Sequence, residues 1–182
     1  AAAVWWYGIQ LDAYGRSDEA IESARHVIAL LPENALGHAS LALFAARAER
    51  TSLAHESAAR AEALNPGYGQ LADLATAYAL IGDRESAQRV FDTTQAAGYG
   101  KLPDHVFHVK MAIAIGDYDR AISHLEQALE EKFPFSVRSM LFFDRDFVAI
   151  RTIRQHPRYR ALVARVRAEQ GGLPEGPATA AF

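Results

Sequence analysis

The sequence predicts an all-α protein: a right-handed α-solenoid of about four helix pairs, closed by a C-terminal helical cap. Two observations lead to this prediction. Roughly a fifth of the residues are alanine, a strong helix former. Four alanines recur 34, 33 and 34 residues apart, and three of them follow a glycine by five residues. A helix pair of this length buries its apolar stripe only against a neighbour, so the pairs must stack. The four alanines are Ala20, Ala54, Ala87 and Ala121.

Composition excludes several other classes of protein. The 182 residues are 50% hydrophobic and 23% charged, so the chain is able to bury a core and is not expected to be disordered. A formal charge of -3 gives no general attraction to nucleic acid. The chain has no cysteine, which excludes disulfides, thiolate metal ligands and a cysteine nucleophile. No apolar stretch approaches the roughly 18 residues of a membrane helix.

The first predicted pair spans residues 1–34. Gly15 ends its first helix, because a left-handed residue at a helix end costs glycine little. Ser17 is the predicted N-cap of the second helix, and Pro32 closes the pair because proline does not continue a helix.

The second predicted pair spans residues 35–67, with Thr51 as the N-cap of its second helix and Pro66 near its end. Glu49 and Arg50 stand where the other pairs have a turn glycine. This departure weakens the turn signal of one pair without disturbing the period.

The third and fourth predicted pairs span residues 68–101 and 102–133. Both join their helices through a Gly-Asp dipeptide, at 82–83 and at 116–117, in which the aspartate is the predicted N-cap. Neither pair ends in a proline.

Beyond residue 133 the period fails while helical patterning continues. Residues 134–170 are predicted to form short capping helices, the last of which begins with Pro157, since proline is favoured at the first helical position. Residues 171–182 contain glycines and prolines and are predicted to be a tail.

The phased segments 15–20, 82–87 and 116–121 resemble the tetratricopeptide repeat (TPR) family over about residues 1–133. The stretch from 143 to 162 resembles the ending of bacterial TPR arrays fused to signalling or transcription-regulator domains. The signature positions of the first repeat are occupied by Tyr7, Gly8, Leu11, Gly15, Ala20, Ala24, Val27 and Pro32.

The resemblance implies that the first helix of each repeat lines a groove that binds a partner. The residues at the groove positions are mainly apolar, which favours a hydrophobic helix or extended segment as the occupant. The positions are Trp5, Ile9, Asp12, Leu36, Ala39, Leu43, Arg47, Ala72, Thr76, Leu80, Val106, Lys110 and Ile113.

Trp5 and Trp6 are adjacent on one predicted helix and therefore point about 100° apart. We expect at least one of them to stay exposed, either as a binding hot spot or to cover the first repeat or pack against an element preceding it.

His105 and His108 lie on one face of a predicted helix, and His124 on the next helix approaches them. Zinc usually needs a third or fourth ligand, so we expect hydrogen-bonded packing histidines, with no metal and no cofactor. No phosphate-binding glycine loop, serine elbow or metal-binding helix motif occurs in the sequence. We therefore expect no enzymatic activity.

Arginines gather near the C-terminal end. A solvated face is the plain interpretation, and docking on an acidic partner domain or on lipid headgroups is the alternative. The candidate docking residues are Arg151, Arg154, Arg158 and Arg165.

Together these features predict a protein–protein interaction scaffold that binds another polypeptide within a larger assembly. Two alternatives remain: a regulatory or sensory module of a larger bacterial signalling or transcription-regulator protein, and an accessory subunit peripheral to a membrane complex. Nucleic acid is not an expected partner. The sequence contains no targeting signal, so bacterial cytoplasm and periplasm both remain open.

Overall fold

The computed structural model describes residues 1–98, 105–131, 153 and 155–169, with only the backbone for Val106 and two residues near the end. Every regular element in these residues is a helix, so the all-α prediction is confirmed. The helices are α1 (Ala2–Ala13), α2 (Ser17–Leu30), α3 (Ala35–Arg47), α4 (Thr51–Ala63), α5 (Tyr68–Leu80), α6 (Arg84–Ala96), α7 (His105–Ala114), α8 (Tyr118–Glu130) and α11 (Pro157–Glu169).

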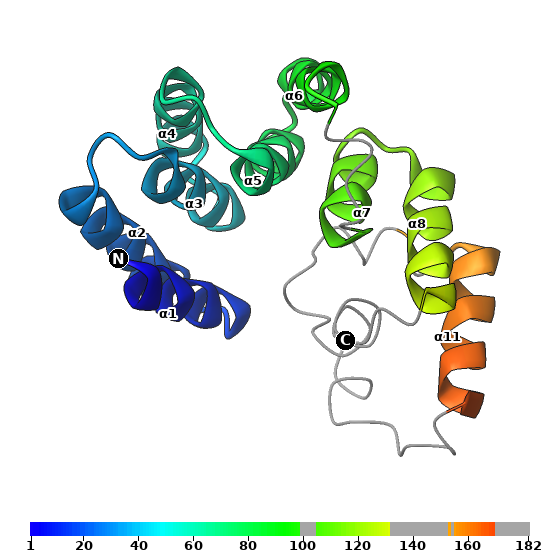
Figure 1. The fold of residues 1–182 in the computed structure, drawn as a ribbon. Helices are drawn as coiled ribbons and strands as arrows, with labels where there is room; N and C mark the ends of the chain where they lie inside the picture. The colour runs from blue at the N-terminus through cyan, green and yellow to red at the C-terminus, as the bar shows by residue number, and fades with distance from the viewer. Residues whose placement is uncertain (99–104, 132–152, 154, 170–182) are drawn as a thin grey trace.

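Consecutive helices pack as pairs: α1 with α2, α3 with α4, α5 with α6, and α7 with α8. The four pairs follow one another along an arch (Figure 1), with α1, α3, α5 and α7 towards its inside and α4, α6 and α8 on its outside. This is a helical-repeat architecture of the general α-solenoid kind. We call the surface formed by α1, α3, α5 and α7 the inner face.

The junctions between pairs are of two kinds. At the first junction α2 packs extensively on α3, whereas the later junctions are made mainly by α3 on α5 and by α5 on α7. At the far end α11 packs on α8 (Figure 1).

The turns inside the pairs follow the predicted glycines. Gly15, Gly82 and Gly116 have φ angles of 75°, 84° and 80°. In the second pair Glu49 takes the same left-handed conformation, with φ of 59°, although its side chain makes that conformation sterically costly. The turn geometry is therefore kept even where the glycine is missing.

Two of the four predicted N-caps are confirmed. The side chain of Asp83 accepts a hydrogen bond from the amide of Ser86 at 3.0 Å, and that of Asp117 accepts one from the amide of Arg120 at 3.1 Å. Each satisfies an amide that lacks a partner within the helix.

The other two N-cap predictions are wrong by one residue. Ser17 and Thr51 are the first helical residues of α2 and α4, and the N-caps are Arg16 and Arg50, which make no side-chain cap bond. The turn has the same length in every pair, so the repeat alignment puts these arginines at the position of the capping aspartates.

Small residues lie where the paired helices cross. Gly8 on α1 faces Ser23 on α2, and a Cβ atom at Gly8 would lie 2.7 Å from the hydroxyl oxygen of Ser23. The recurring alanines are at most 1% exposed, as expected of close helix contacts: Ala20, Ala54, Ala87 and Ala121.

The last helix begins at Pro157, as predicted. Ile153 together with Tyr159 and Leu162 of α11 belongs to one buried cluster with residues of α7 and α8. The other predicted capping helices and the tail, 171–182, lie outside the described residues. Among the described helices, none has both the length and the hydrophobicity to span a bilayer.

Candidate functional site

The predicted groove residues lie on the four helices of the inner face. Trp5 and Ile9 are on α1; Leu36, Leu43 and Arg47 on α3; Thr76 and Leu80 on α5; Val106 and Lys110 on α7. Leu43 and Thr76 are buried, and the others with described side chains are half-buried. The inner face is therefore a packed surface with partly accessible side chains.

A cavity of about 530 Å³ lies between the third and fourth pairs and brings together four of the predicted groove positions. Thr76 and Leu80 line it from α5, and Lys110 and Ile113 line it from α7. Thr76 donates its hydroxyl hydrogen to the carbonyl oxygen of Ala72 at 2.8 Å, so this hydroxyl is satisfied within its own helix.

Lys110 is held by an aspartate of the preceding pair. Its Nζ lies 3.1 Å from Oδ1 of Asp73 on α5, and both side chains are largely buried. The ammonium also lies 5.9 Å from the centroid of the Phe107 ring. The positive charge in the cavity is therefore compensated before any ligand arrives.

Arg47 is compensated in the same way. It forms an ion pair with Asp12 on α1, and the side chains are 13% and 2% exposed. The sequence placed Asp12 at a groove position but did not foresee either ion pair. The signal was present, since each aspartate precedes its cation by about one repeat along the first helices.

The two tryptophans differ in their surroundings. Trp5 donates its indole hydrogen to the hydroxyl oxygen of Ser40 at 3.0 Å and so bridges α1 and α3. Trp6 is 54% exposed. The expectation that at least one of the pair stays exposed is therefore confirmed.

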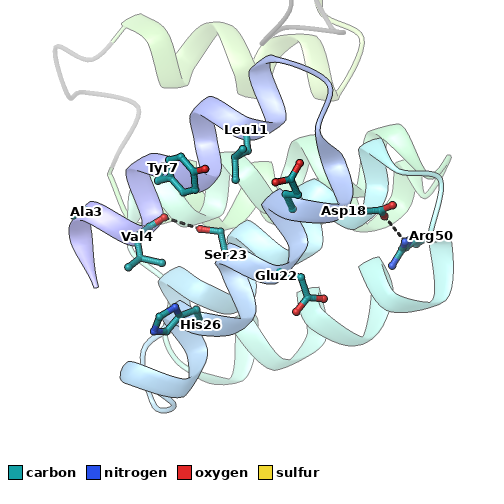
Figure 2. A pocket seen from close by; sticks show the side chains of 10 residues that line it. Ala3, Val4, Tyr7, Leu11, Asp18, Glu22, Ser23, His26 and Arg50 are labelled. Atoms are coloured by element: carbon teal, nitrogen blue, oxygen red, sulfur yellow. Dashed lines mark hydrogen bonds and ion pairs between the residues drawn. The ribbon is translucent and has the colours of Figure 1, made fainter.

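A larger cavity, of about 830 Å³, lies at the first end of the arch, beside α1 and α2 (Figure 2). Tyr7 and Leu11 line it from α1, and Ser23 and His26 line it from α2. Ser23 donates its hydroxyl hydrogen to the carbonyl oxygen of Val4 at 2.7 Å. The sequence interpretation treated Tyr7 only as a repeat-signature residue. The signal that could have identified it is the aromatic ring of Tyr7 at a position where the second and third repeats carry leucine.

The three histidines at the fourth pair lie together, as predicted. The rings of His108 and His124 stack with centroids 4.8 Å apart, and His105 lies 6.0 Å from His124. Burial, then the neighbouring His108 and His105, lower the pKa of His124 to about 4.

Two of these histidines are hydrogen-bonded across helices, in agreement with packing roles. Nε2 of His105 lies 2.9 Å from Oε2 of Glu131, and Nδ1 of His108 lies 3.0 Å from the hydroxyl of Tyr68. Within the described part of the chain, no group of three or more histidine and acidic side chains has the geometry to hold a metal ion.

The predicted basic docking residues are only partly described. Arg158 lies 2.9 Å from Asp119 and 2.8 Å from Glu126, both on α8, so it ties α11 to the fourth pair. Arg165 is exposed on α11. Arg151 and Arg154 lie outside the described residues, so docking at this end stays a prediction.

No protein-family model and no curated protein sequence matches this chain. The inner face offers apolar and half-buried side chains, and its cations Arg47 and Lys110 are neutralised by ion pairs within the chain. Such a surface is suited to an apolar segment of a partner rather than to a free carboxylate.

Proposed function

We propose that the chain is a TPR-type, right-handed solenoid that acts as a protein–protein interaction scaffold. In this proposal a partner polypeptide lies along the inner face and is held there within a larger assembly. The supporting features are the 34-residue period of the sequence and the four consecutive helix pairs arranged along an arch. The chain acts by binding and carries no catalytic step.

The observation that carries the proposal is the cavity between α5 and α7. Leu80 and Ile113 supply apolar walls, and the ion pair between Lys110 and Asp73 removes the net charge that would repel an apolar ligand. A leucine or aromatic side chain of a partner helix or extended segment fits this chemistry.

The test begins with a pull-down from the native source, followed by mass spectrometry of the retained proteins. Binding of each retained protein is then measured with the chain and with Leu80→Gln. We expect at least about a tenfold loss of affinity, because the substitution puts a polar amide into an apolar contact.

Leu30→Gln is the matched control, since Leu30 is 48% exposed at the end of α2, away from the cavity. Circular dichroism verifies that both variants fold. Equal affinities of Leu80→Gln and the unmodified chain would contradict the proposal. So would binding that falls steeply with salt and is lost in Arg165→Ala, because the basic end would then be the interface.

A further inference from the structure

The large exposed apolar side chains of the described residues all belong to the first helix pair and its end. Trp6, Tyr7 and Tyr14 are 54%, 57% and 71% exposed, and Leu30 and Leu31 are 48% and 40% exposed. Trp6 and Tyr7 on α1 and Tyr14 at its C-cap are three exposed aromatic rings, which we call the patch, and exposed apolar groups gathered in this way usually mark an interaction site.

The repeat shows what covers this patch in the other pairs. One period after Trp6 and Tyr7 the chain has Ser40 and Leu41 on α3, which are 2% and 6% exposed. Leu41 belongs to the same buried cluster as Ile21 of α2, the helix that packs on α3. The patch on α1 is therefore the counterpart of a surface that docks on a preceding pair.

The same position is also buried in the third and fourth pairs, although α5 and α7 pack there mainly on the first helix of the preceding pair. Leu74 and His108 occupy the position of Tyr7, and they are 0% and 7% exposed. Only in the first of the four described pairs is this position open to solvent.

A small residue at the edge of the patch fits the same docking geometry. Gly37 on α3 lies against Ile28 of α2 so closely that a Cβ atom there would come within 2.7 Å of the Ile28 side chain. Its counterpart on α1 is Ala3, which lines the 830 Å³ cavity together with Tyr7 (Figure 2).

The charges at the rim are also repeated. Asp18 of α2 and Glu33, just beyond the end of α2, pair with Arg50, the N-cap residue of α4, and with Arg60 of α4. One period earlier the chain has Arg16, the N-cap residue of α2, and His26 on α2, both exposed. Arg16 pairs with Glu19 at the start of its own helix, so an added pair would bring a second carboxylate to this arginine.

We propose that the outward face of α1, formed by Ala3, Trp6 and Tyr7 together with the C-cap residue Tyr14, docks a further helix pair of the same repeat type. The second helix of that pair packs on α1 as α2 packs on α3. Its acidic residues meet Arg16 and His26. This inference concerns a surface separate from the inner face and does not depend on what binds there.

The test extends the full chain by one pair. A copy of residues 1–34 is placed before residue 1, which supplies the two acidic residues and ends in an asparagine like the one that caps α3. In the copy both tryptophans become alanine, to make room for Trp6. In the chain itself Trp5→Phe leaves Trp6 as the single fluorescent reporter.

We expect the added pair to fold and the acrylamide quenching constant of Trp6 to fall to about a third or less, because docking removes the ring from solvent. Tyr7→Glu should restore quenching in the extended chain while leaving the melting temperature of the unextended chain unchanged. The matched control Ala59→Glu, at an exposed site on α4, should do neither.

Two results would overturn the proposal. One is an extended chain in which acrylamide quenches Trp6 as readily as in the unextended chain. This result counts against docking whether or not helical signal is gained, because a single pair is stable only when docked. The other is an acrylamide quenching constant of Trp6 in the unextended chain that falls as the protein concentration rises, with the mass of a dimer observed at the same concentrations. A second copy would then be the occupant.

Discussion

The two ends of the helix array are built differently. At the last end, α11 covers the fourth pair, and Leu162 of α11 and Leu125 of α8 are 4% and 1% exposed. At the first end, Tyr7 of α1 is 57% exposed beside a large cavity. Each pair in such an array has two faces to bury. Among the residues that the structure describes, the face at the fourth pair is covered by a helix and the face at α1 is not.

This difference makes it possible to separate the effect of packing from the effect of residue type. Tyr7 and Leu162 are both large and apolar, but only Leu162 is surrounded by other side chains. Truncating Leu162 should therefore lower the free energy of unfolding, whereas truncating Tyr7 should leave it nearly unchanged.

The largest expected effect comes from truncating these two residues. Leu162→Ala should lower the free energy of unfolding by about 2–4 kcal/mol, because it removes buried methyl groups and leaves a cavity. Tyr7→Ala should change it by no more than about 0.5 kcal/mol, as for other exposed sites. Urea unfolding followed by circular dichroism measures both. Equal losses would mean that the first end is covered in solution.

The turn glycines should behave alike at both ends. Gly15→Ala and Gly116→Ala each place a side chain at a φ angle of 75° or 80°, where no neighbouring atom lies within 4 Å. The backbone cost alone is about 1–2 kcal/mol in each case. The same urea experiment measures it. A loss seen only at Gly116 would show that the first pair unfolds separately from the rest.

Acid should weaken the covered end through His124. Because the pKa of His124 is lowered to about 4 from 6.5, the unfolded chain takes up this proton first. The contribution is fully present above pH 6.5 and is lost as the pH falls from 6.5 towards 4. Its slope is at most about 1.4 kcal/mol per pH unit, and partial exposure of the ring makes it smaller.

His124→Gln isolates this effect from the carboxylates that titrate in the same range. The difference in unfolding free energy between the chain and this variant, measured at several pH values between 7 and about 4, should shift in favour of the variant as the pH falls. A pH-independent difference for His124→Gln would contradict the assignment.

The smallest effect is expected for the arginine that ties α11 down. Arg158→Ala removes two ion pairs that are largely exposed, so the loss of stability should be smaller than in the preceding cases and should shrink with added salt. Arg25→Ala, which removes the exposed pair with Glu22 at the open end, is the matched control. A loss as large as that of Leu162→Ala, unaffected by salt, would point to packing by the arginine stem instead.

The repeat period alone predicted a large part of this architecture. Gly82 turns left-handed and Asp83 caps α6 because these roles depend on neighbours along the chain, and Ala87 is buried because the two helices of a pair cross at the same place in every repeat. The same reasoning failed for Ser17, since a cap one residue away leaves the pattern of apolar positions unchanged.

The sequence did not predict features that depend on how pairs rotate against each other. The ion pair of Arg47 with Asp12 requires two helices one repeat apart to present those side chains at the same height. The contact between Gly8 and Ser23 depends on the crossing point of α1 and α2. A period of about 34 residues fixes neither quantity.

Both tryptophans of the sequence, Trp5 and Trp6, lie on α1, with ring centroids 6.1 Å apart. Intrinsic fluorescence therefore reports the unfolding of one terminal pair, while far-UV circular dichroism averages over all helices. In an array held together by contacts between neighbours, a terminal unit frays before the interior. The gap between the two denaturation midpoints then measures how strongly the first pair is coupled to the second, and coincident midpoints would mean all-or-none unfolding.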